Sequence, residues 1–369
     1  MLKSIYFYLF HILGKMQEYT MPEYLCEVLI VEIFTRLPPK SLLRFSSLSK
    51  SLYSIICSPN FIRIHTFRSP QKILIRHTNR EIFYTLHSEE HLASCTSGIS
   101  ATNFPYNSYY WIVGSCNGIL CLYDNSDENH VILWNPSIRR KLNLPICPLR
   151  CFQIGFGFDP ITDDYKIVSI PKYYGGGRGR GITQSSFVYT MKKGCWCEIG
   201  FPSSSSSSAY GVLSFTCFVN GALHWVVVKD YLTDSNDDVG RYILTFDLST
   251  HVFGMISLPE PNWETRHVTT IQDSLAVISL KHDQSWIWIR REASWSVVYK
   301  FVEGVMGVLQ LSNNYDLLVR TYGKTLQIYN SKTGARSELV GFNDVFYRDD
   351  IVLCVESLQL LDTGIPDLS

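Results

Sequence analysis

The sequence predicts an α+β chain in which a small N-terminal helical unit precedes a mainly antiparallel all-β domain. Two observations carry this prediction. Apolar residues recur at helical spacing over residues 20–65, whereas from about residue 70 they gather in short runs rich in Val, Ile, Tyr, Phe and Trp, separated by turn residues. No long amphipathic pattern interrupts these runs, which argues against βαβ units and the enzyme folds built from them. We expect a β-propeller of about six blades, with a β-sandwich as the alternative.

Residues 1–19 are expected to be an extension without ordered structure. Their apolar run, from Ile5 to Leu13, is far shorter than the roughly 18 residues that a membrane span needs. The run has the length of a signal-peptide core, but no small-x-small cleavage site follows it. Met16 and Met21 are both possible translation starts.

The helical unit is predicted over residues 20–65. Thr20 and Glu23 have the spacing of a capping box, with Pro22 in the first turn, so a helix is expected to begin here. Pro38-Pro39 should end it, because proline lacks the amide donor. A second apolar series follows and is expected to close at Ser58-Pro59. A unit of about 45 residues is too small for a comfortably stable isolated core, so we expect it to bind a partner.

Two kinds of turn recur in the β domain. The first precedes an apolar strand and recurs at a mean spacing of about 49 residues, which is the size of one propeller blade, when the longest gap is counted as two periods. Its members are Asn117-Gly118, Asn220-Gly221, Gln272-Asp273 and Asn313-Asn314. The second follows an aromatic strand end and contains Asn135, Asp159, Asp247 or Asn330. Together the two turns predict four strands per repeat.

Charge and cysteine content limit the possible partners. The 33 basic and 33 acidic residues cancel, so no global basic field exists and neither nucleic acid nor a membrane is expected as a partner. The 11 cysteines are odd in number and lack paired spacing, which indicates free thiols in a reducing compartment, either the cytoplasm or the nucleus.

Few residue patterns suggest catalysis. Gly114-Ser-Cys116-Asn-Gly118 has the glycine spacing of a nucleophile elbow, but an apolar strand pattern follows Gly118, so an Asn-Gly hairpin turn is the favoured interpretation. Cys195 and Cys197 lack the further ligands of a zinc site. His224 lies in an apolar run and is expected to be a hydrogen-bonded core residue. We therefore predict no catalytic residue, no cofactor and no metal site.

Several motifs resemble those of one protein family. Residues 21–45, including the segment Arg-Leu-Pro-Pro-Lys-Ser-Leu-Leu-Arg-Phe at 36–45, and residues 49–61 closely resemble the F-box of plant F-box proteins. Downstream, similarity to the F-box-associated domain is carried by residues 114–122, 133–140, 155–168 and 219–225. The sequence departs from the family pattern at Met21-Pro22, where Leu-Pro is usual, and at Ser49-Lys-Ser-Leu52, where Cys-Lys-x-Trp is usual.

The resemblance implies a domain organisation and a function. It places the F-box at 20–65, the F-box-associated domain, a kelch-like propeller, at 70–345, and a C-terminal strand and tail at 346–369. It implies a non-catalytic substrate-recognition subunit of an SCF-type cullin-RING ubiquitin ligase. The F-box would bind the S-phase-kinase-associated adaptor and, through it, cullin. The adaptor-facing residues would be Pro22, Ile33, Leu37, Pro38, Leu42, Leu43 and Leu48.

The β domain would hold a protein target for ubiquitination and degradation. The target and its binding residues are not identifiable from the sequence, although loops such as 173–181 and 231–240 are where binding residues can vary without disturbing the fold. A glycan-binding or scaffold β module is an alternative, as is a cysteine hydrolase that uses Cys116.

Overall fold

The computed structural model divides the chain into two compact units, Met1–Ser69 and Pro70–Ser369. It describes residues 27–79, 81–89, 92, 110–124, 130–148, 152–175, 185–200, 209–213, 216–229, 240–260, 263–311, 315–323, 325–339, 342 and 351–359. The predicted extension, the capping box at Thr20, Pro22, the turn at Asn313-Asn314 and most of the two candidate target-binding loops therefore lie outside the described residues.

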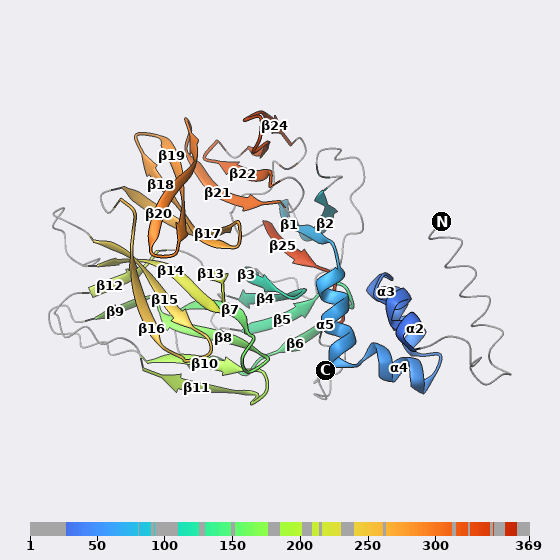
Figure 1. Cartoon of the computed structure of the whole chain (residues 1–369). Coiled ribbons are helices and arrows are strands. Elements are labelled where there is room, and N and C mark those ends of the chain that lie inside the picture. The colour runs from blue at the N-terminus through green and yellow to red at the C-terminus, as the bar shows by residue number, and fades with distance from the viewer. Residues whose placement is uncertain are drawn as a thin grey trace. The chain divides into compact units, whose positions relative to one another are not determined.

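The described part of the first unit is helical (Figure 1). Serine and proline residues mark where three of its helices begin. Pro39 and Pro59 occupy first-turn positions, and the hydroxyl oxygens of Ser49 and Ser58 accept hydrogen bonds from the amides of Leu52 and Phe61. The helices are α2 (Glu27–Phe34), α3 (Pro39–Ser46), α4 (Lys50–Ile56) and α5 (Pro59–Arg68).

The second apolar series closes at Ser58-Pro59 as predicted, because α4 ends at Ile56. The same pair also begins a further helix, α5, which continues to Arg68. A Ser-Pro pair fits both situations, because proline terminates the preceding helix and also starts the next one at its first position.

The core of the helical unit joins residues from all four helices. The rings of Phe34 and Phe45 stack with their centroids 5.3 Å apart, and Leu42 and Ile56 are fully buried. On α5, the His65 ring nitrogen Nε2 lies 2.9 Å from the carbonyl oxygen of Leu37. These contacts bring the last helix back against the turn that follows α2.

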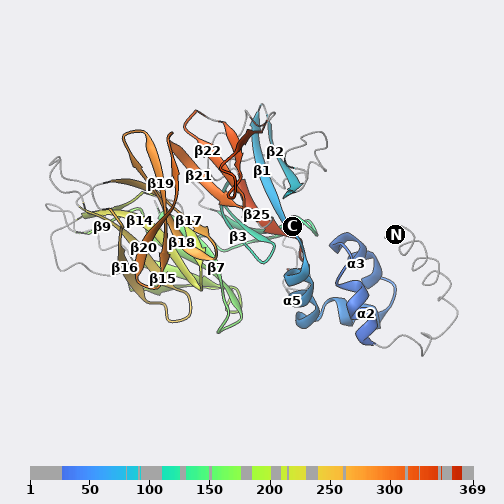
Figure 2. The same cartoon turned by 45° about the horizontal axis from the view of Figure 1, so that its top comes forward.

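The second unit consists, in its described part, of six antiparallel sheets (Figures 1 and 2). The first sheet contains β3 (Tyr110–Cys116), β4 (Ile119–Asp124), β5 (Val131–Asn135) and β6 (Arg140–Asn143). The second contains β7 (Phe152–Asp159), β8 (Asp164–Pro171), β10 (Ser186–Thr190) and β11 (Cys195–Ile199). The third contains β13 (Cys217–Val219), β14 (Ala222–Lys229), β15 (Arg241–Asp247) and β16 (Phe253–Ser257), extended by β12 (Ala209–Val212) and β9 (Tyr173–Gly175).

The remaining three sheets complete the unit. The fourth contains β17 (Glu264–Ile271), β18 (Ser274–Lys281), β19 (Gln284–Arg291) and β20 (Ser294–Phe301). The fifth contains β21 (Val305–Gln310), β22 (Leu317–Thr321), β23 (Leu326–Tyr329) and β24 (Arg336–Glu338). The sixth pairs β25 (Ile351–Val355) with β1 (Gln71–Asn79), and β1 with β2 (Glu81–Ser88).

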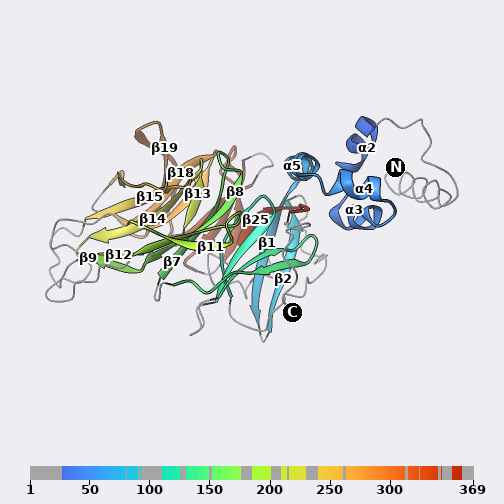
Figure 3. The same cartoon turned by 90° about the horizontal axis from the view of Figure 1, so that it is seen from below.

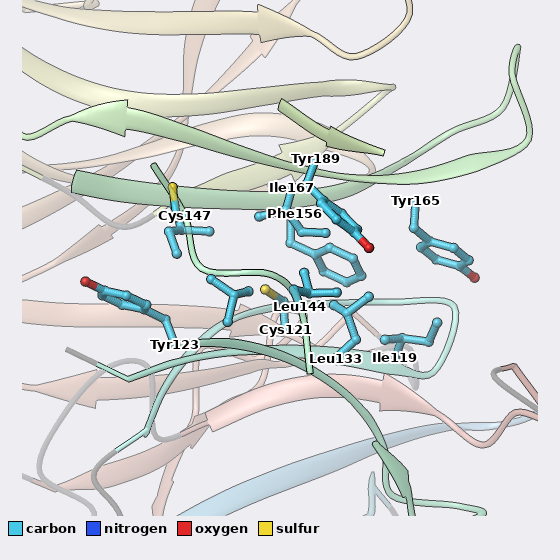
Figure 4. Close-up of a cluster of buried hydrophobic side chains, with 12 residues drawn as sticks. Ile119, Cys121, Tyr123, Leu133, Leu144, Cys147, Phe156, Tyr165, Ile167 and Tyr189 are labelled. Carbon is cyan, nitrogen blue, oxygen red and sulfur yellow. The ribbon is translucent and has the colours of Figure 1, made fainter. Parts of the chain in front are cut away.

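Hydrophobic clusters between successive sheets show that the sheets form a closed ring. In the cluster between the first and second sheets, Cys121 and Leu133 face Phe156 and Ile167 (Figure 4). Comparable clusters lie between the second and third sheets, the third and fourth, the fourth and fifth, and the fifth and sixth. Figure 3 shows the yellow strands β14 and β15 beside the green strands of the second sheet.

The last of these clusters lies between the sixth sheet and the first sheet. It packs Leu74 and Tyr84 of the sixth sheet against Leu120 and Trp134 of the first. Because the series of contacts comes back to the sheet where it began, the unit is a closed β-propeller with six blades. The prediction of about six blades is confirmed, and the β-sandwich alternative is wrong.

Both ends of the β unit's chain meet in the sixth blade. β25 pairs with β1 in the register Ile73↔Leu353 and Ile75↔Ile351, and the views place red β25 beside blue β1 (Figures 1 and 2). Beyond β25 the chain reaches the first blade. There the side-chain amide of Asn135 donates hydrogen bonds to the carbonyl oxygens of Ser357, at 3.1 Å, and Gln359, at 2.8 Å.

The first kind of predicted turn lies where the repeat pattern placed it. Asn117-Gly118, Asn220-Gly221 and Gln272-Asp273 each join the first and second strands of a blade. Both residues of each pair have positive φ, between 50° and 80°. This is the left-handed geometry that a two-residue hairpin turn requires, which explains the preference for Asn, Asp and Gly at these positions.

One member of the second kind was misassigned. The turns at Asn135, Asp247 and Asn330 join the third and fourth strands of their blades, but Asp159 lies between β7 and β8, the first and second strands. Its carboxylate accepts a hydrogen bond from the amide of Ile161, two residues on, as Asn135 does from Ser137. The same side-chain chemistry serves both turns, so the residue type alone cannot separate them.

Candidate functional site

The helical unit carries large apolar side chains on its surface. Val28 and Leu29 on α2 are 71% and 51% exposed, and Leu48, just after α3, is 53% exposed. Tyr53 on α4 and Phe67 on α5 are exposed as well. These exposed apolar side chains are the candidate contacts of the helical unit with a protein partner.

The predicted adaptor residues divide between this surface and the core. Leu48 and Pro38 are exposed, and Ile33 and Leu43 are half-buried. Leu37 and Leu42 are 6% and 0% exposed. These two side chains are buried in the core of the unit, and the adaptor contact expected for the whole set stays a prediction.

The burial of Leu37 and Leu42 could not be read from helical spacing. Helical spacing identifies which residues share a stripe but does not say which stripe the fold covers. The sequence of α2 contains two apolar stripes, and the one with Ile30 and Phe34 is buried while Val28 and Leu29 face outward. Helical spacing did not single out Tyr53 or Phe67, which are also exposed.

Cys116 does not occupy a nucleophile elbow. An elbow requires a helix directly after the turn, whereas Gly118 is followed by β4, which pairs with β3 in an antiparallel hairpin. Burial raises the pKa of the Cys116 thiol to about 12, against the weaker opposing effect of a hydrogen bond with the Phe158 backbone. At neutral pH the group is a thiol rather than the nucleophilic thiolate, so the geometry does not support the hydrolase alternative.

The other candidate side chains also have structural surroundings. His224 is buried on β14, and its Nδ1 atom lies 3.3 Å from the Cys217 carbonyl oxygen, as expected for a core histidine. Burial lowers the pKa of His224 to about 4. Cys195 and Cys197 lie on β11, at the edge of the second sheet. Within the described residues, no group of three or more His, Cys, Asp and Glu side chains could hold a metal ion.

A buried ion pair within the second blade reaches the third blade through its lysine, and no local sequence pattern marks it. The ammonium group of Lys166 donates hydrogen bonds to the Asp159 carboxylate, at 2.8 Å, and to the Leu248 carbonyl oxygen, at 2.6 Å. The Nε2 atom of His251 lies 3.2 Å from the same ammonium. Burial alone would raise the pKa of Asp159, but hydrogen bonds from Lys166, Thr162 and the Ile161 amide lower it to about 2. The Asp159 carboxylate therefore stays ionised at neutral pH, and the contacts of Lys166 with Leu248 and His251 join the two neighbouring blades.

The described part of the chain contains no helix that is both long and apolar enough to cross a membrane.

Comparison with known proteins identifies both units. Residues 23–64 match the F-box domain, and residues 72–336 match the F-box associated beta propeller domain. Among Arabidopsis thaliana proteins, F-box protein At3g07870 is 25% identical over 86% of this chain and 88% of its own length. F-box protein CPR1 is 26% identical over 73% of this chain and 71% of its own.

The similarity to other relatives covers less of their length. The chain spans 60% of putative F-box protein At1g33530, with 26% identity, and 63% of putative F-box protein At4g21240, with 25% identity. The match to the propeller domain nevertheless covers most of this chain and includes all of β3 to β23. The chain therefore belongs to the family of F-box proteins that carry an F-box-associated β-propeller domain.

Proposed function

We propose that the protein is the substrate-recognition subunit of an SCF-type cullin-RING ubiquitin ligase. In this proposal the helical unit binds the S-phase-kinase-associated adaptor, which in turn binds cullin. The propeller holds a protein target while a separate enzyme delivers the ubiquitin, so the chain itself performs no catalysis. The observation that carries the proposal is the exposed apolar surface of the helical unit, formed by Val28, Leu29, Leu48 and Tyr53.

An exposed apolar surface lowers the free energy of a complex when a partner covers it. Each large apolar side chain that is removed from water stabilises a complex by roughly 1.5–3 kcal/mol before association costs are counted. Several such side chains on one small unit supply the central patch of a specific interface. The chain folds as two separate compact units, which supports a division between adaptor binding by one unit and target binding by the other.

We also propose that the protein works in a reducing compartment, the cytoplasm or the nucleus. In support, the eight cysteines of the described residues are all free thiols, four of them buried. The odd number and unpaired spacing of the cysteines in the sequence are also typical of proteins in a reducing compartment.

Adaptor co-purification tests the interface. The double variant Leu29→Asp/Leu48→Asp places two charges on the exposed surface without entering the core. We expect adaptor recovery to fall at least tenfold, because an unpaired charge in an apolar interface is strongly unfavourable. Val252→Asp is the matched control, since Val252 is 61% exposed but lies in the propeller unit. Equal adaptor recovery by the double variant and the control would contradict the proposed surface.

The same double variant tests the division of labour. Proteins captured by the wild-type chain in the presence of a proteasome inhibitor should still be captured by the double variant, but they should no longer carry ubiquitin. Loss of target capture together with adaptor capture would contradict separate sites. Captured proteins that never carry ubiquitin, even with the adaptor bound, would favour the scaffold alternative.

A further inference from the structure

A cavity of about 240 Å³ lies at the centre of the propeller. Each of the six blades contributes to its wall through β3, β7, β13, β17, β21 or β25. One wall residue from each of these strands is, in order, Ile112, Phe156, Phe218, Thr270, Val308 and Leu353. The cavity therefore exists only because the ring is closed, and any molecule inside it would contact all six blades.

The wall is chemically selective. Most of its residues are aliphatic or aromatic. Two hydroxyl groups of the wall already donate hydrogen bonds to backbone carbonyl oxygens: Thr269 to Val308, at 3.0 Å, and Thr216 to Ile154, at 2.5 Å. Arg320 is a buried basic residue of the wall, and the described wall residues include no carboxylate. This surface favours an apolar occupant and disfavours a cation.

The sequence leaves this space open at Gly114. A Cβ atom added to Gly114 would meet no atom within 4 Å, and its backbone is not in the left-handed region. Gly114 also lies at a β-bulge, where the pairing of β3 with β4 shifts between Ile112 and Gly114. Bulges of this kind are common beside functional sites.

The volume is more than a packing defect. Protein interiors rarely contain voids much larger than a water molecule. An engineered cavity of about 150 Å³ with apolar walls binds benzene, so a cavity of about 240 Å³ has room for two fused aromatic rings.

We propose that the central cavity is a binding site for a small, uncharged, largely apolar aromatic molecule of one or two rings. The site is independent of the adaptor surface. Because the occupant would touch every blade, its binding would stabilise the closed ring, and the unfolding temperature would rise with the logarithm of the ligand concentration once that concentration exceeds the Kd.

The test uses 2-naphthol as an uncharged probe and the full-length chain. We expect saturable binding with a Kd below about 1 mM by calorimetry, together with a rise in unfolding temperature. The cation 2-naphthylmethylammonium should bind at least tenfold more weakly, because its charge would be buried without a carboxylate partner.

Gly114→Leu fills the cavity and should weaken 2-naphthol binding at least tenfold while the unfolding temperature is kept or raised. Gly200→Leu is the matched control: its added side chain also meets open space, but Gly200 lies outside the cavity, so its affinity should equal that of the wild type. If Gly114→Leu does not fold, Gly114→Ala should still weaken binding about threefold. Absence of saturable binding to the wild type, or an unchanged Kd in the folded Gly114 variant, would overturn the proposal.

Discussion

Replacing Asn135 by alanine should destabilise the propeller more than its place in a turn suggests. The side chain is fully buried, and its amide nitrogen donates to the carbonyl oxygens of Ser357 and Gln359, which are more than 220 residues away in the sequence. Its own oxygen accepts from the Ser137 amide at 2.9 Å and fixes the local turn. The substitution thus removes both a local turn contact and the attachment of the C-terminal segment to the first blade.

The expected loss can be worked from these contacts. A hydrogen bond contributes about 0.5–1.5 kcal/mol net, and leaving a buried carbonyl without its donor costs about 1–3 kcal/mol. Two carbonyls and one turn contact therefore predict a decrease in the free energy of unfolding of about 2.5–7.5 kcal/mol.

Asn330→Ala supplies the matched control. Asn330 occupies the corresponding turn of the fifth blade, and its side-chain oxygen accepts from the Lys332 amide in the same way. The same oxygen also accepts hydrogen bonds from the amide and the hydroxyl of Thr333, at 2.8 and 2.9 Å, but these contacts stay within the turn, and the Asn330 amide nitrogen lies 3.5 Å from the nearest Asp316 oxygen. Because the turn contacts are exposed and water can replace them, we expect a loss of about 1–2 kcal/mol. Guanidinium denaturation of the three full-length proteins measures the difference, and losses that agree within about 0.5 kcal/mol would refute the role of Asn135 in closing the ring.

Three further predictions concern single side chains. Gly118→Ala should destabilise the protein by several kcal/mol more than Gly221→Ala in the same denaturation assay. Both glycines have positive φ, but at Gly118 the new Cβ would lie 2.4 Å from the Ser357 hydroxyl oxygen and 2.7 Å from a backbone oxygen. At Gly221 the new Cβ would meet no atom within 4 Å. The pKa of His224 is about 4 in the folded protein and 6.5 in the unfolded chain, so its contribution to stability is present above pH 6.5 and is lost as the pH falls toward 4. We expect the free energy of unfolding of the wild type to fall by about 2 kcal/mol between pH 7 and pH 5 through this residue. The His224→Gln variant should show a correspondingly shallower pH dependence. Cys116→Ser should leave ubiquitin transfer to a captured target within about twofold of wild type, and abolished transfer with intact folding and target binding would restore the catalytic interpretation of Cys116.

Local features of the fold could be predicted from the sequence because they depend on neighbouring residues. The hairpin turns at Asn117-Gly118 and Asn220-Gly221 have positive φ, and few residue types tolerate that geometry. The strand texture is equally local. From these features the blade period and the number of blades follow.

Features that join distant residues could not be predicted in this way. The Lys166 ammonium meets Leu248 and His251 across 82 and 85 residues of sequence, and no local pattern marks such a contact. The same limit applies to the candidate adaptor surface. Whether Leu37 or Leu29 faces outward depends on which helices pack against α2, and periodicity along one helix does not contain that information.

The pairing of β1 with β25 has a consequence for how the protein is made. The ring cannot close until residues 351–355 are available to the strand at 71–79, so the propeller remains an open arc throughout most of its synthesis. Loop closure over such a separation is slow compared with the formation of individual hairpins. Chains that stop before Ile351 would lack the strand that seals the sixth blade and the segment that contacts Asn135. They would present unpaired strand edges and exposed core surface, which are features that cellular quality control binds. Ring closure thus makes truncated chains distinguishable from full-length ones by their exposed strand edges and core surface.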